Sequence, residues 1–86
     1  MILKTSDLNY GVNRPQEWWD DHPEFEAEYQ LIKKNIAEKG INDQVEVTYH
    51  KDSGWTVQVG NQRLRAANEL NILEINCVIE RTKNGL

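Results

Sequence analysis

The sequence has a single cysteine, Cys77, and no long apolar stretch. One cysteine excludes an intramolecular disulfide and a cysteine-based zinc site. The apolar runs reach only two or three residues, whereas a membrane-spanning helix needs about 20. The start of the chain also lacks the basic and apolar regions of a secretory signal. These absences predict a soluble cytoplasmic protein that does not use a membrane.

Basic side chains are scarce relative to acidic ones, with 10 Lys and Arg against 14 Asp and Glu and a net charge of −4. This balance argues against a protein that grips nucleic acid by bulk charge. A chain of 86 residues has room for one small core, so residues 1–86 are expected to form a single domain. His22 and His50 are isolated in the sequence, and no metal site is expected.

What the sequence does contain is an amphipathic helix over residues 24–39. Apolar side chains recur along it at steps of four, three and four, which makes one stripe. The residues of this stripe are Phe25, Tyr29, Ile32 and Ile36. Acidic residues lie in the first turns and basic residues in the last, as the helix dipole favours. Gly40 follows at a position where a left-handed cap is expected.

Strand patterns follow this helix. Alternating apolar residues predict strands near 45–50 and 55–59, joined by a hairpin turn at residues 51–54. A second helix is expected near residues 62–70, with Asn71 in the left-handed cap position.

The remaining segments complete the expected fold. Residues 1–8 could supply a short edge strand, residues 9–23 have the turn residues of a long loop, and the last strand is expected near 75–80. The order predicts an α/β (α+β) fold with a small mixed sheet, a β-hairpin and a strand-helix-strand crossover to a parallel neighbour.

The turn after the second hairpin strand carries the strongest chemical signal. A strand ends at Gly60, and a helix with two arginines near its start follows. Unpaired N–H groups and the dipole at a helix start attract anions. Asn61 could serve as the N-cap, and Arg63 could add a bidentate phosphate contact. The alternative is structural: the glycine makes a tight turn, and the arginines are solvated or paired with glutamates.

Residues 60–66 read Gly-x-x-Arg-x-x-Ala and follow a hydrophobic strand. In this context they resemble the central motif of the ParB N-terminal/sulfiredoxin-like superfamily. The other matching segments are Asn13-Arg14-Pro15, residues 31–47 and residues 75–79. The similarity extends over most of the chain and implies the ParB/sulfiredoxin-like fold.

The resemblance implies a module that binds a nucleotide or another phosphate ligand, with CTP or ATP and Mg²⁺ as candidates. In the family, the phosphates lie against the glycine-to-helix turn. Carried over to this sequence, the binding residues are Gly60, Asn61, Gln62, Arg63, Arg65, Arg14 and Gln44. Weak nucleotide hydrolysis is left open, and no catalytic residue is assigned. Small stand-alone relatives also suggest a phage or plasmid protein.

Departures from the family pattern narrow these expectations. Sulfiredoxin has its catalytic cysteine where this chain has Asn61, so sulfiredoxin activity is rejected. ParB proteins usually have an acidic residue and an arginine at positions 61 and 62, and they carry a downstream DNA-reading domain. DNA binding or nicking is therefore the weakest interpretation, unless the basic residues converge on one face. Those residues are Arg14, Lys33, Lys34, Arg63 and Arg65.

Trp18 and Trp19 lie in the expected loop and have two interpretations. They could fold back over the sheet or the helix and close the small core. They could instead be exposed aromatic contacts for a nucleotide base or for a partner. The partner would be another protein or a second copy, which would also meet the acidic start of the helix. In that case the chain is a non-catalytic interaction or regulatory protein. Cys77 is expected to be a buried small apolar residue.

Overall fold

A computed structural model describes residues 1–12 and 14–80. Asn13, the first residue of the upstream motif, lies outside the described residues. The elements are β1 (Ile2–Lys4), a 3-10 helix (Thr5–Asp7), β2 (Leu8–Tyr10), α1 (Gln16–Asp20), α2 (Pro23–Lys39), β3 (Val45–His50), β4 (Gly54–Val59), α3 (Asn61–Glu69) and β5 (Glu74–Ile79).

The strands form one mixed sheet in the order β1-β5-β3-β4-β2. The hairpin pair β3–β4 and the edge pair β1–β5 are antiparallel. The pairs β3–β5 and β2–β4 are parallel. The mixed sheet, the hairpin and the strand-helix-strand crossover are confirmed. The predicted direction of the crossover was wrong: the connection from β4 through α3 passes over β3, which is antiparallel to β4 and parallel to β5, so β4 and β5 run antiparallel and are not neighbours.

The main core lies between this sheet and α3. Val47 and Val57 are fully buried on facing strands, and Leu64 of α3 packs against the same cluster. Burial of a side chain such as Leu64 stabilises the fold by roughly 1.5–3 kcal/mol relative to its exposure. The other buried members of the cluster are Leu8, Val45, Ala67, Ile75 and Cys77.

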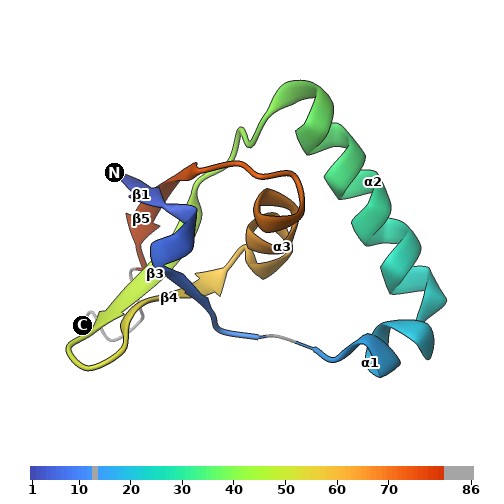
Figure 1. The fold of residues 1–86 in the computed structure, drawn as a ribbon, viewed down its shortest axis with the longest axis horizontal. Coiled ribbons are helices and arrows are strands. Elements are labelled where there is room, and N and C mark those ends of the chain that lie inside the picture. Colours follow the sequence, from blue (N-terminus) through green and yellow to red (C-terminus); the bar gives the residue numbers. More distant parts are fainter. Residues whose placement is uncertain (13, 81–86) are drawn as a thin grey trace.

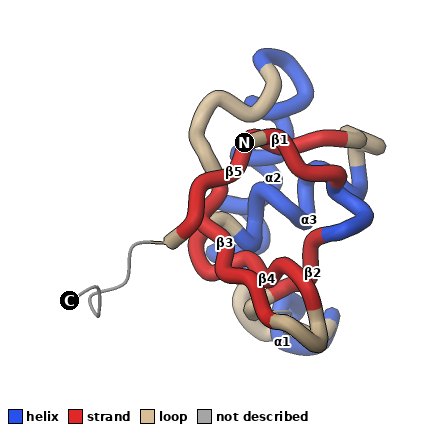
Figure 2. The backbone as a smooth tube through the Cα atoms, turned by 90° about the vertical axis from the view of Figure 1, so that its left-hand side faces the viewer, coloured by secondary structure: helices blue, strands red, loops and turns tan. Residues whose placement is uncertain are grey.

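A second cluster joins α2 to α3. Tyr29 and Ile36 of α2 pack against Ala66 of α3, and Trp19 and Ile32 lie at the margin. Figure 1 shows the result, with α3 between the strands and α2. Figure 2 shows the helices gathered on one side of the strands. Helix α2 therefore reaches the sheet mainly through α3.

The two helix ends differ in how well they follow the sequence. After α2, Gly40 has φ +78° but ψ −179°, so it does not adopt the left-handed cap conformation expected there. After α3, Asn71 has φ +58°. At the end of α3 the N–H of Ile72 donates to the carbonyl of Ala67 at 2.8 Å, and the N–H of Asn71 donates to that of Asn68 at 3.4 Å. This is the Schellman pattern of a left-handed cap, which confirms the predicted role of Asn71.

The first 23 residues differ from the expectation. Residues 1–8 do not form one edge strand, because a 3-10 helix separates β1 from β2, and these strands occupy opposite edges of the sheet. Residues 9–23 are not a continuous loop, since they contain most of β2 and all of α1. Helix α1 has only five residues, too few for an apolar period to show.

Cys77 is buried in β5, as predicted. Burial raises the pKa of its thiol, which keeps the thiol protonated and unreactive at neutral pH. In residues 1–12 and 14–80, no helix is long and apolar enough to cross a membrane.

Candidate functional site

Gly60 makes the turn between β4 and α3 with a left-handed backbone, at φ +107° and ψ +25°. A side chain here would be strained, and its Cβ would lie 3.1 Å from Val45 Cγ2 and 3.2 Å from an Arg63 nitrogen. Gly60 is also the N-cap residue of α3, and this helix start has no side-chain cap hydrogen bond. The prediction that Asn61 is the N-cap was therefore wrong.

Asn61 instead uses its side chain to bridge β4 and the segment that follows β2. Its Oδ1 accepts a hydrogen bond from the backbone N–H of Gly11 at 2.9 Å. Its Nδ2 donates to the backbone carbonyl of Val57 at 3.2 Å. Asn61 thus connects the start of α3 to the segment that follows β2.

A cleft of about 480 Å³ opens on one side of this turn. We call it the Arg63 cleft. It is lined by Ile32, Asn35, Ile36, Gly40, Ile41, Asn42, Asp43, Val59, Gly60, Asn61, Gln62 and Arg63. All four residues expected to cradle phosphate from the turn therefore border one cavity. Arg63 lies 3.5 Å from the exposed carboxylate of Asp43, a contact of little strength at the surface.

A second cleft of about 450 Å³ opens on the other side. This Arg14 cleft is lined by Tyr10, Val12, Arg14, Gln16, Trp19, Asn61, Gln62, Arg65 and Glu69. Asn61 and Gln62 border both cavities, so the start of α3 is the wall between them. Arg14 and Arg63 consequently face different cavities. Gln44 borders neither cleft and is exposed.

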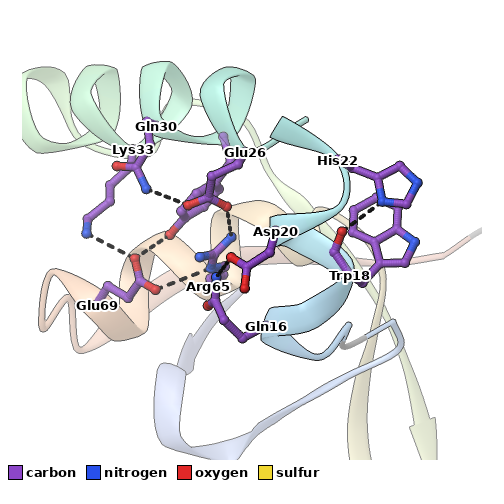
Figure 3. A network of polar contacts seen from close by, with 10 residues as sticks. Gln16, Trp18, Asp20, His22, Glu26, Gln30, Lys33, Arg65 and Glu69 are labelled. Carbon is purple, nitrogen blue, oxygen red and sulfur yellow. Dashed lines mark hydrogen bonds and ion pairs between the residues drawn. The ribbon is translucent and has the colours of Figure 1, made fainter. Parts of the chain in front are cut away.

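Arg65 is held by partners on two helices. It lies 3.3 Å from Glu26 of α2 and 3.2 Å from Glu69 of α3. Its guanidinium also stacks on Tyr29 at 3.8 Å and on Trp19 at 4.5 Å from the ring centroids. Figure 3 shows this guanidinium between the two carboxylates. These contacts favour the structural interpretation for Arg65, in which an arginine pairs with glutamates.

Glu69 extends the same network. Its carboxylate accepts from the Tyr29 hydroxyl at 2.8 Å and lies 3.0 Å from the Lys33 ammonium. Burial and the hydrogen bond to Glu69 raise the pKa of the Tyr29 hydroxyl well above its usual range. Burial opposes the charge of Arg65, but Glu26, Tyr29 and Glu69 outweigh it and raise the Arg65 pKa. The network is therefore charged at neutral pH.

The Glu69 network predicts acid-sensitive stability. Burial alone would raise the pKa of Glu69, but the Tyr29 and Lys33 hydrogen bonds and the charge of Arg65 lower it below its usual 4.5. A lowered folded-state pKa gives stability that is present above the unfolded pKa and is lost as the pH falls through the folded value. In urea unfolding, Glu69→Gln should be less stable than the wild type at pH 7. The two free energies should converge below about pH 4, and a constant difference from pH 7 to 3 would contradict this assignment.

Trp18 and Trp19 pack within the chain. Trp19 faces Tyr29 with ring centroids 6.0 Å apart. Trp18 stacks on His22 at 4.0 Å, and the Arg14 guanidinium covers its ring at 4.1 Å. Both tryptophan side chains are half-buried. This packing favours the interpretation in which Trp19 closes the core beside Tyr29. Trp18, by contrast, packs against His22, Phe25 and Arg14 outside both core clusters. His22 also contacts the Trp18 carbonyl at 2.7 Å through Nδ1, and among the described residues no cluster of three metal-ligating side chains occurs.

Four of the five basic residues considered for DNA binding do not gather into one free surface. Lys33 and Arg65 pair with Glu69, whereas Arg63 and Arg14 border separate clefts. This arrangement gives no support to the interpretation as a DNA-binding protein.

The sequence reasoning missed several residues of these clefts. Asn35 and Asn42 face the Arg63 cleft, and Gly11 supports the wall through Asn61. Asn35 lies three residues after Ile32 on α2, so the helix period could have placed it beside the cleft. Nothing in the local sequence indicates the contact of Gly11, because its partner is 50 residues away.

The sequence model of the family described as the ParB N-terminal domain matches residues 2–85 of this chain. The chain belongs to the ParB N-terminal domain family. Among solved structures, it is similar to the C-terminally truncated chromosome-partitioning protein ParB from Caulobacter crescentus complexed with CTP-gamma-S. The TM-score is 0.69 at 14% identity, over 98% of this chain and 45% of that one. No curated protein sequence matches this ParB-like chain.

The ParB likeness confirms the fold expected from the sequence motif. At 14% identity, it concerns the fold and leaves the ligand open. This ParB N-terminal domain spans less than half of the similar ParB structure.

Proposed function

We propose that this domain binds a nucleotide whose phosphates lie against the Gly60 turn, in the Arg63 cleft. The observation that carries the proposal is the start of α3, which has no side-chain cap and borders that cleft. The N–H groups of a helix start and the helix dipole together favour phosphate. The ParB relative complexed with CTP-gamma-S supports a nucleoside triphosphate as the ligand.

The lining of the Arg63 cleft combines charged, apolar and amide groups that suit the different parts of a nucleotide. Arg63 has one weak surface partner, Asp43, so it can turn toward a phosphate and form a charge-assisted bond. Ile32, Ile36 and Ile41 border the same cavity and offer an apolar surface for a base. Asn35 and Asn42 add side-chain amides that can donate to and accept from a base edge. The volume of the Arg63 cleft, about 480 Å³, falls within the range of small-molecule sites.

CTP is the first candidate because of the ParB relative, and ATP is the second. Mg²⁺ would enter with the triphosphate, which supplies oxygen ligands of the kind Mg²⁺ prefers. We propose binding as the activity of this domain and assign no catalytic residue. Phosphate release measured beside binding would test the weak hydrolysis suggested by the family resemblance.

Calorimetric titration with CTP and ATP, each with Mg²⁺, is the direct test. We expect binding that weakens about 10- to 100-fold in Arg63→Ala, because a hydrogen bond to a charged group contributes about 1.5–3 kcal/mol. Lys34→Ala is the matched control, since this exposed cation borders neither cleft, and it should bind as the wild type does. No binding at millimolar nucleotide, or equal binding by Arg63→Ala, would refute the proposal.

A further inference from the structure

The parallel pair β2–β4 ends where the two strands diverge toward α1 and α3. Its last register pair is Tyr10 and Val57. Beside that pair lie one backbone donor and one backbone acceptor, the N–H of Gly11 and the carbonyl of Val57. Both are taken by the side-chain amide of Asn61, at 2.9 and 3.2 Å.

The Asn61 amide therefore takes the place of a backbone peptide group. It donates through Nδ2 and accepts through Oδ1, as one peptide unit would. A carboxylate of the same size would accept from Gly11 but could not donate to Val57. An alanine would do neither. The bond to the Val57 carbonyl is partly buried, and a partly buried acceptor that loses its partner is costly, whereas the Gly11 N–H is exposed and would exchange with water.

The approach of the two chains is close enough to depend on glycine. A Cβ on Gly11 would overlap the carbonyl oxygen of Val57 and would lie 3.6 Å from Asn61 Nδ2. The Gly11 backbone thus rests directly on the end of β4. The chain that leaves this point reaches Arg14 three residues later.

We infer that Asn61 is a positioning residue, whose amide clamps the Gly11 segment to the start of α3 and so fixes the wall shared by the two clefts. This inference rests on the proposed function, because the clamped wall is the one that would face the phosphates. Asn61 and Gln62 border both cavities, so loosening the clamp changes both. Asn61 then affects ligand binding by holding the Gly11 and Val57 backbone in place, and not by contacting the ligand.

The test combines amide hydrogen exchange with titration by CTP and Mg²⁺ on the full chain. In Asn61→Ala, the exchange of the Gly11 amide should rise at least tenfold, while amides paired between β3 and β5 keep their rates. Affinity for the nucleotide should fall about tenfold, the equivalent of one lost hydrogen bond. Asn61→Asp keeps the acceptor and should give intermediate protection of Gly11.

Asn68→Ala is the matched control. Asn68 is exposed on the same helix and also holds β2, through a bond to the Tyr10 hydroxyl at 2.9 Å, but it borders neither cleft. This variant should leave both the Gly11 exchange and the affinity unchanged. An unchanged Gly11 exchange in Asn61→Ala overturns the clamp, even if affinity falls, because Asn61 would then be a direct ligand.

The two proposals fail in different ways. Wild-type chain that binds neither CTP nor ATP overturns the proposed function, and the role of the clamp in binding falls with it. Wild-type binding together with equal binding by Asn61→Ala overturns the positioning role alone. Faster exchange throughout the sheet in Asn61→Ala also overturns it, because the side chain would then support global stability and not this wall.

Discussion

Arg65→Ala should lower the melting temperature of this domain by about 10–20 °C. The variant removes the cation between Glu26 and Glu69 and the ring contacts to Tyr29 and Trp19. Breaking one side of a buried ion pair costs about 3–5 kcal/mol. The Arg65 side chain is still 20% exposed, so we expect the free energy of unfolding to fall by about 2–3 kcal/mol. In a domain of this size, each kcal/mol shifts the melting temperature by about 4–8 °C.

Arg63→Ala is the matched control for this thermal unfolding experiment. Arg63 lies two residues earlier on the same helix, but its single ion pair is with a carboxylate that is 78% exposed. Its loss should change the free energy of unfolding by less than about 0.5 kcal/mol. Equal destabilisation by the two alanine variants would contradict the distinction between an Arg65 held by two glutamates and an Arg63 with a weak surface contact.

Gly11→Ala should destabilise the fold by about 1–3 kcal/mol, and by more if the strands cannot move apart. The added Cβ would overlap the Val57 carbonyl oxygen, which is backbone and cannot rotate away. Urea unfolding followed by circular dichroism measures the effect. Because β2 pairs with β4 next to this contact, the variant should also weaken the edge of the sheet.

Val12→Ala serves as the control for Gly11→Ala. Val12 is the next residue in the chain and is 53% exposed, so its truncation should cost less than about 0.5 kcal/mol. A Gly11→Ala variant as stable as the wild type would show that the Gly11 segment is free to move away from β4.

The elements that the sequence predicted well are those with local causes. The stripe on α2 repeats over about three turns, and its buried members Tyr29 and Ile36 lie where the period places them. Gly60 and Asn71 mark turns that need a positive φ, and both have one. Helix α1 was missed because its five residues lie among turn residues and are too few for a period.

The candidate site was predicted less well, because its chemistry depends on distant partners. Arg63 and Arg65 look alike in the sequence, yet Arg65 meets Glu26, which is 39 residues away. Asn61 resembles an N-cap, but Gly11 lies 50 residues before it and takes its side chain. Both arginines border a cleft, but the packing of α2 on α3 decides which of them is paired with glutamates. Single-sequence patterns carry no information on that packing.

The order of the sheet has a consequence for how the chain folds during synthesis. Both edge strands come from the first ten residues, whereas their partners, β4 and β5, come from residues 54–79. Within this domain, β1 and β2 are therefore synthesised first but cannot pair until residues 54–79 have been made. The three central strands and α3 lie in the contiguous residues 45–79 and can assemble first. Closing the sheet then requires two long loops, and that non-local step is the slow one.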